Sequence, residues 1–205
     1  MIMVEKTFTA ASAPNPDDAR RTRILEGAMT VFLAYGFQRT TMDDIARAAD
    51  ISRPALYLLF RNKSDIFRAL AADFLRQMMS SARSVLAGDE PLSERLERTL
   101  FRMLDHMTEV EQSPHGAELL DIKNSLAGDI LSACRTDFLG LVEAAVAREA
   151  QRSGARLGEK GISPAILAGM LLDAVDGMKM RALPPERQRE AVSRYIAIIS
   201  EAISS

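Results

Sequence analysis

The chain has 205 residues, 47% of them hydrophobic and 26% charged, so it is long enough to bury the core of one large domain or two small ones. Only 5% are aromatic while 11 are Met, a composition that favours helices over sheets. The net charge of −2 argues against a strongly basic protein, the lone Cys134 excludes an internal disulfide framework, and no run approaches the ~20 apolar residues that cross a bilayer. We expect a cytoplasmic protein with no membrane partner.

The N-terminal third carries the clearest helix signals. Residues 1–16 are rich in Ala, Ser, Thr and Pro and are predicted to form a mobile tail. A first helix is predicted over 17–35, where an apolar stripe has helical spacing and Gly36 provides the stop. Thr41 opens a short second helix, because Asp44 three residues later completes a variant of the capping box.

Two further N-caps follow. Ser52 is placed to cap a third helix, and Pro54 fits its first turn, where a missing N–H costs nothing. Asn62 caps a fourth, longer helix that begins near Lys63. We expect this fourth helix to join the N-terminal part of the chain to the remainder.

The rest of the chain also reads as helical, without a period-2 strand pattern or an internal repeat. A glycine-containing loop is predicted over 154–161. The five helical segments predicted here lie at about 92–107, 117–123, 131–145, 163–183 and 186–204. The predicted fold class is all-α with about nine helices: a three-helix helix-turn-helix head over 17–64, followed by a larger helical body over 65–205.

Residues 41–60 have the spacing of a helix-turn-helix. Apolar anchors lie beneath the second helix of the unit, and small Ala46 stands where its two helices meet. Such a helix lies in the major groove with its N-terminal residues at base edges, where Arg53 can bond guanine and Ala55 can touch a thymine methyl. The alternative is that three short amphipathic helices form a purely structural bundle.

Charge is distributed unevenly in a way that suits DNA. Residues 20–63 hold eight basic and four acidic side chains, a net +4, which leaves −6 for all other residues. Thr40, Thr41, Tyr57 and Lys63 are placed to hold phosphates. The full set predicted to contact DNA is Arg21, Arg39, Thr40, Thr41, Ser52, Arg53, Pro54, Ala55, Tyr57 and Lys63.

These residues resemble the N-terminal signature of the TetR/AcrR family of bacterial transcriptional regulators. The resemblance covers about 45 residues in continuous register. The residues that carry it are Arg23-Ile24-Leu25, Ala28, Phe32, Tyr35-Gly36-Phe37, Thr40-Thr41, Ile45-Ala46, Ala49, Ile51-Ser52, Leu56-Tyr57, Phe60, Lys63 and Phe67. It implies a dimeric repressor with one DNA-binding head per subunit and a larger helical body that binds a ligand.

The sequence departs from the family pattern at three positions. Asp50 stands in the turn where Gly is usual, and Asp is one of the few residues that tolerate left-handed backbone. Leu59 replaces a frequent His, which removes a phosphate contact, and Pro54 replaces a small residue of the recognition helix. The operator preferred by relatives therefore cannot be transferred to this chain.

The resemblance implies pairing through the last two helices, and their composition suits that role. Both are apolar on more than one face, so a second buried surface is required. Complete burial inside one subunit is the alternative. The predicted dimer-interface residues are Leu167, Leu171, Ala174, Met178, Tyr195, Ile198, Ile199 and Ala202.

The effector is expected to be a small apolar molecule held between body helices, because Met adapts to varied apolar shapes. His106 and His115 lie among acidic residues and raise the alternative of a metal effector, with solvated surface as the simpler interpretation. No cofactor is expected. The predicted ligand-binding residues are Met103, Leu104, Met107, Leu120, Cys134, Phe138 and Met170.

Two other classes of protein compete with a regulator. An enzyme is disfavoured because two His and one Cys, without a nucleophile elbow or a phosphate-binding glycine loop, supply no nucleophile, base and orienting group together. A helical adaptor would show no salt-dependent duplex binding. The sequence thus predicts a homodimeric repressor that binds a pseudo-palindromic DNA operator and is released by a small molecule.

Overall fold

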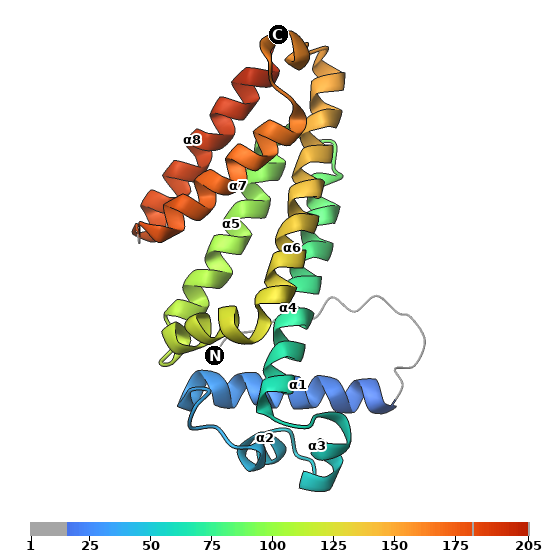
Figure 1. Ribbon diagram of the computed structural model, residues 1–205, viewed down its shortest axis with the longest axis vertical. Coiled ribbons are helices and arrows are strands. Elements are labelled where there is room, and N and C mark those ends of the chain that lie inside the picture. The colour runs from blue at the N-terminus through green and yellow to red at the C-terminus, as the bar shows by residue number, and fades with distance from the viewer. Residues whose placement is uncertain (1–15, 182, 205) are drawn as a thin grey trace.

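The computed structural model describes residues 16–181 and 183–204. Within them the fold is all-α, as predicted, and Figure 1 shows a small head below a long helical body. Of the predicted tail over 1–16, all but residue 16 lies outside the described residues. The elements are α1 (Pro16–Tyr35), α2 (Met42–Ala48), α3 (Arg53–Leu59), α4 (Lys63–Leu86), α5 (Leu92–Glu111), α6 (Gly116–Ser153), the 3₁₀ turn η1 (Leu157–Lys160), α7 (Pro164–Met180) and α8 (Pro185–Ile203).

The predicted N-caps of the head are confirmed. Thr41 Oγ1 accepts the Asp44 N–H at 3.2 Å, and the Asp44 carboxylate accepts the Thr41 N–H at 3.0 Å, which completes the capping box of α2. Ser52 caps α3 at 3.3 Å and Asn62 caps α4 at 2.9 Å, each by accepting the N–H three residues on. These caps set where the short helices of the head begin.

The core of the head extends beyond its three helices. The Phe32, Phe37 and Phe67 rings form a triangle with centroids 5.3–6.0 Å apart, and Phe67 belongs to α4. Leu119, near the start of α6, is buried in the same core. Gly27 lets α1 approach α2 closely, because a Cβ there would lie 2.8 Å from the Ala49 nitrogen. Both α4 and α6 therefore take part in the head.

The two helices predicted at 117–123 and 131–145 both lie within α6, on either side of a kink; with α6 counted as one bent helix, the described residues hold eight α-helices, close to the predicted nine. The backbone leaves helical geometry at Ala127 (φ −134°, ψ 20°). The carbonyl of Leu126 accepts a hydrogen bond from Arg68 of α4 at 2.5 Å, and a side chain inserted into the helix ladder is a recognised cause of kinks. The two predicted segments are thus the two arms of one bent helix.

The body core is formed by α5, α6, α7, α8 and the C-terminal end of α4. Two arginines bond the C-terminal end of α4. Arg95, which is fully buried, donates to the Leu86 carbonyl at 2.7 Å, and Arg148 donates to the same carbonyl at 2.6 Å. Arg95 also pairs with Glu149 at 2.6 Å. Cations at a helix C-terminus satisfy unpaired carbonyls and oppose the helix dipole. None of the described helices is long and apolar enough to span a membrane.

Candidate nucleic-acid interface

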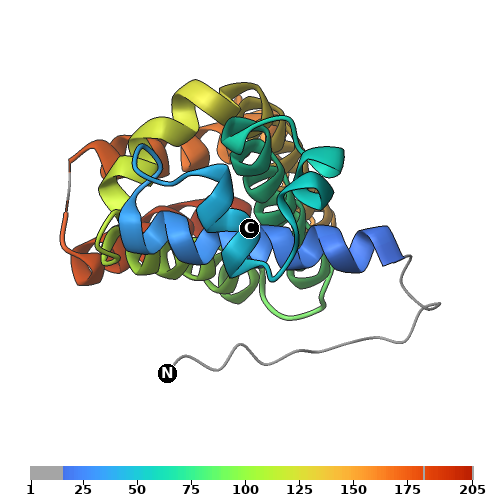
Figure 2. The same ribbon diagram turned by 90° about the horizontal axis from the view of Figure 1, so that it is seen from below.

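The α2–turn–α3 unit lies at the end of the molecule farthest from the α7–α8 pair (Figure 1), and Figure 2 views this end. The turn holds Asp50 in left-handed backbone (φ 52°), as the sequence predicted. The Ile51 N–H donates to the Ala46 carbonyl at 3.0 Å, and Ile45 and Leu56 are fully buried beneath the two helices. The unit presents the outer side of α3 away from the body.

The predicted recognition residues share that outer side of α3. Ser52, Arg53, Pro54 and Tyr57 are exposed, and Ala55 is half-buried. Sequence analysis missed Leu58, whose side chain is 82% exposed. Its position two residues after buried Leu56 is the signal that could have found it, because such residues lie on opposite sides of a helix.

Arg53 has partners within the head. Its Nε lies 2.5 Å from Asp43 Oδ1 of α2, and its guanidinium carbon lies 5.9 Å from the centre of the Tyr57 ring. A hydrogen bond to Tyr57, followed by the charge of Asp43, raises the pKa of Arg53. The side chain is thus charged and held in one place while remaining exposed.

Two predicted phosphate contacts are corrected. The Thr40 side chain is buried, and its hydroxyl donates to the Gly36 carbonyl at 2.6 Å. The Lys63 ammonium donates to the carbonyls of Phe37, Gln38 and Thr40 at 2.7–3.0 Å. An ammonium has three N–H groups, so these bonds use all of them. Both side chains shape the loop between α1 and α2 and do not face a phosphate.

The other predicted DNA residues lie on the surface of the head. Arg21 of α1 is exposed, with its guanidinium carbon 5.0 Å from the centre of the Phe60 ring. Arg39 is exposed in the loop before α2. The Thr41 hydroxyl donates to the Asp44 carboxylate at 2.6 Å, in addition to the two bonds of the capping box. All three residues are therefore accessible in the free protein.

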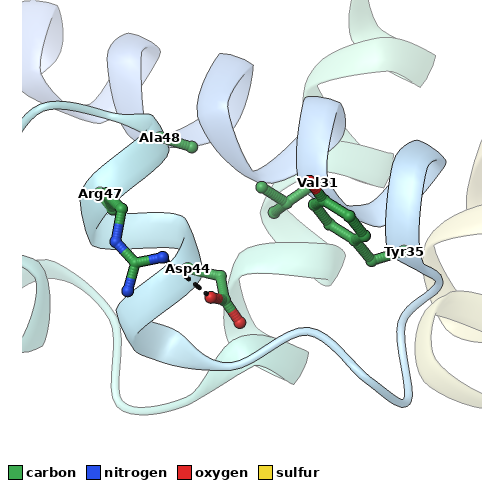
Figure 3. A pocket seen from close by; sticks show the side chains of 5 residues that line it. All are labelled: Val31, Tyr35, Asp44, Arg47 and Ala48. Carbon is green, nitrogen blue, oxygen red and sulfur yellow. Dashed lines mark ion pairs between the residues drawn. The ribbon is translucent and has the colours of Figure 1, made fainter.

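A hollow of about 240 Å³ lies between α1 and α2 (Figure 3). Its lining includes Val31 and Tyr35 of α1, and Asp44 and Arg47 of α2, which form an ion pair at 3.6 Å. Because an ion pair occupies one wall and Tyr35 is 60% exposed, the hollow offers little enclosed apolar surface. We assign no ligand to it.

The structure brings three of the predicted ligand residues together in the body core. Leu104 and Phe138 lie in the body core, and Met103 packs against it. Leu120 and Cys134 are half-buried, and burial followed by the charge of Asp137 raises the pKa of the Cys134 thiol. Met170 is corrected, because it points outward from α7 with 58% of its surface exposed.

A body cavity of about 320 Å³ contains one of the predicted ligand residues, Met107 of α5. It lies among the last turns of α5, the end of α7 and the start of α8. The remaining lining residues are Thr108, Glu111, Lys179, Leu183 and Gln188.

Each histidine lies near the carboxylate of a glutamate three residues further along the chain. His106 Nδ1 lies 3.5 Å from a Glu109 oxygen, and His115 Nδ1 lies 3.6 Å from a Glu118 oxygen. In the part of the chain that the structure describes, no three His, Cys, Asp or Glu side chains gather closely enough to hold a metal ion.

Four predicted dimer residues are corrected. The core of the same protomer buries them, with 0–4% of their surface exposed; they are Leu167, Leu171, Met178 and Ile199. Ala174, Tyr195 and Ala202 are half-buried, while Ile198 is 63% exposed. The large apolar side chains that α7 and α8 expose are Ile166, Met170, Met180 and Ile198.

Head and body are joined by specific polar contacts between α4, α6 and the head. Glu118 Oε1 of α6 accepts the Gln38 N–H at 2.9 Å. Arg68 of α4 makes a bidentate pair with Asp129 of α6 at 2.6 and 2.7 Å, next to the kink. The hydrogen bond from Arg68 is the main reason that the pKa of Asp129 falls from 3.8 to about 2.

Comparison with known proteins matches the head of the chain to one family. Residues 24–70 match the family model described as "Bacterial regulatory proteins, tetR family". An uncharacterized HTH-type transcriptional regulator of Bacillus subtilis, YhgD, is 31% identical over 42% of this chain and 45% of its own length. The repressor KstR2 of Rhodococcus jostii is 30% identical over 62% of this chain and 65% of its own. The first curated relatives are thus matched over only about half their length, 45–49%.

Solved structures extend the likeness to the body. SmeT, the repressor of the Stenotrophomonas maltophilia multidrug efflux pump SmeDEF, superposes with a TM-score of 0.65 over 87% of this chain and 89% of its own, at 24% identity. The fatty acid degradation regulator FadR of Bacillus halodurans gives a TM-score of 0.62 over 90% and 96%, at 17% identity.

The fold and the α2–α3 unit define a helix-turn-helix protein whose small head is attached to an all-helical body. The family model matches that head, and the solved structures share the fold over 87–90% of the chain. The resemblance to the TetR/AcrR family of transcriptional regulators is confirmed.

Proposed function

We propose that the protein is a homodimeric transcriptional repressor, which binds a pseudo-palindromic DNA operator in the cytoplasm and is released by a small molecule. The observation that carries the proposal is the exposed N-terminal end of α3, with Ser52 and Arg53 at the far end of a TetR-type head. A recognition helix placed in this way reads base edges in the major groove.

Dimerisation is supported by the outward faces of α7 and α8, which pack side by side in Figure 1. Ile166 and Met170 are 48% and 58% exposed on α7, and Ile198 is 63% exposed on α8. A Cβ added at Gly169 or Gly177 would meet nothing within 4 Å. An apolar face with small residues suits close, self-complementary contact with a second copy.

The proposed release from DNA is supported by α4, a helix that belongs to both the head and the body. In α4, Ile66 and Phe67 lie in the head core while Ala82 and Leu86 lie in the body core. In a two-fold dimer, two recognition helices about 34–36 Å apart reach successive half-sites on one face of DNA. A ligand that favours another arrangement of the body changes that spacing and shifts the equilibrium by its differential affinity for the two states.

The proposal is tested by DNA binding of full-length protein to an operator selected from random duplexes. Arg53→Ala should lower operator affinity by about tenfold or more, because a guanidinium that reads a base is lost. Arg156→Ala, which removes an exposed arginine that precedes η1 and pairs with Glu159, is the matched control and should leave affinity unchanged. Wild-type affinity should fall steeply with salt. An operator affinity that Arg53→Ala leaves intact would contradict the assignment of α3.

A further inference from the structure

The side of α3 that faces away from the head core is apolar. Successive residues of a helix are about 100° apart, so Pro54 and Leu58 lie on one side of α3 and buried Leu56 lies on the opposite side. Leu58 is 82% exposed, Pro54 is exposed, and Ala55 beside them is half-buried. Together, Pro54, Ala55 and Leu58 form what we call the apolar face of α3, on the helix at the lower end of the molecule in Figure 1.

The apolar face has no side-chain group that can hydrogen-bond to a base edge. Its three side chains carry no donor or acceptor, and Pro54 also lacks a backbone N–H. Within α3 only Arg53 and Tyr57 have polar side chains, and these lie one turn apart along the same edge of the helix. That edge meets α2, because Arg53 pairs there with Asp43. Hydrogen bonding to bases is therefore confined to one edge of α3, and its outermost surface can make only apolar contacts.

We propose that the apolar face reads thymine through its C5-methyl group, so that each operator half-site carries thymines beside the base pair that Arg53 contacts. In unmodified DNA the thymine methyl is the one apolar group that projects from the base edges into the major groove. A polar base edge placed against Leu58 would lose hydrogen bonds to water without replacement, which disfavours the other bases. The net charge of +4 over residues 20–63 supplies the attraction to phosphates that brings this face to DNA. The inference rests on the proposed function and adds a base preference to it.

The test uses the full-length protein and an operator selected from random duplexes. Each thymine of a half-site is replaced in turn by deoxyuridine, which removes the methyl and keeps every hydrogen-bonding group of the base. Fluorescence anisotropy at constant salt measures the affinity. At one or two positions of each half-site, uracil should lower affinity about fourfold per methyl, the factor for loss of one buried methyl group. Replacement of thymines outside the half-sites should have no effect.

Two variants assign this discrimination to the apolar face. Leu58→Ala should fold normally because the side chain is exposed, and it should bind thymine and uracil nearly equally at the position that Leu58 contacts. Phe74→Ala, which removes an exposed apolar side chain of α4 outside the α2–α3 unit, is the matched control and should keep the wild-type ratio. The readout is the ratio of two affinities of one variant, so a general loss of DNA binding does not change it.

The inference is overturned if uracil replaces every thymine without loss of affinity, or if the selected half-site contains no thymine. It is also overturned if Leu58→Ala distinguishes thymine from uracil at every position as well as the wild type does. Its failure is separable from that of the proposed function. Salt-dependent operator binding without a uracil effect would refute methyl reading alone, whereas a protein that selects no duplex would refute the regulator.

Discussion

At the residue scale, contacts within the head position the Arg53 side chain in the absence of DNA. The Asp43 carboxylate 2.5 Å away and the Tyr57 ring hold the guanidinium at the surface of α3. To bond a base or a phosphate, Arg53 must exchange Asp43 for the new partner. Asp43 also repels phosphates, so only a site that offers good hydrogen bonds compensates for the exchange. Asp43 is thereby a candidate determinant of specificity that sequence analysis did not single out.

We predict that Asp43→Asn increases affinity for duplexes of unrelated sequence by about two- to fivefold, the effect of one exposed ion pair. Operator affinity should rise less, so the ratio of specific to non-specific affinity falls. Fluorescence anisotropy with an operator and a scrambled duplex measures both. Glu26→Gln, which removes a negative charge from exposed α1, controls for net charge. An unchanged ratio in Asp43→Asn would show that Asp43 does not restrain Arg53.

The role of a side chain could be predicted where its hydrogen-bond partner lies close in the sequence, and not where the partner is distant. The caps Thr41, Ser52 and Asn62 were predictable, because each bonds an N–H only three residues away. Left-handed Asp50 is likewise a local preference. Lys63 was misassigned because its three carbonyl partners lie 23–26 residues away, and sequence pattern does not show which loop folds onto a side chain.

At the element scale, the periodicity of apolar residues predicts the helices. It does not predict which face of a helix packs in the core of its own subunit and which face is exposed. Both α7 and α8 are apolar on two sides, so Leu171 and Ile198 were equally good interface candidates until packing buried one and exposed the other. The bend of α6 at Ala127 could not be located from the sequence pattern either, because the Leu126 carbonyl beside it bonds to Arg68 of another helix, α4. Such contacts depend on tertiary structure, which overrides local preference.

The Arg68–Asp129 pair should make the junction of α4 and α6 sensitive to acid. Because the pKa of Asp129 is about 2 in the folded protein and 3.8 ordinarily, the unfolded chain binds more protons between these values. The stabilisation is present above pH 3.8 and is lost as pH falls through about 2. Urea unfolding from pH 5 to 2 should show wild type more stable than Asp129→Asn at pH 5, with the difference vanishing toward pH 2.

Asp121→Asn serves as the control for that measurement. Asp121 is an exposed carboxylate of the same helix outside the Arg68 pair, so it separates loss of the pair from loss of one negative charge. A difference between wild type and Asp129→Asn that stayed constant from pH 5 to 2 would refute the linkage.

At the scale of the whole molecule, charge and apolar surface are separated. The segment over 20–63 carries +4 and the remainder −6, and the exposed apolar faces of α7 and α8 belong to the remainder. A polyanion is attracted to one end, while the proposed association with a second copy would use the other part. One head reaches one half-site, so tight operator binding depends on the second surface through effective concentration.

We therefore predict that Ile198→Glu converts the protein to a monomer and lowers affinity for a duplex with two half-sites by about a hundredfold. Affinity for a duplex with one half-site should remain unchanged, because α3 is intact. Sedimentation equilibrium and anisotropy measure the two effects. Ala197→Glu places the same charge on exposed α8 surface about 100° around the helix and should leave the dimer intact. If Ile198→Glu stayed dimeric, or lost half-site binding as well, the outward face of α8 would not be the surface that pairs the heads.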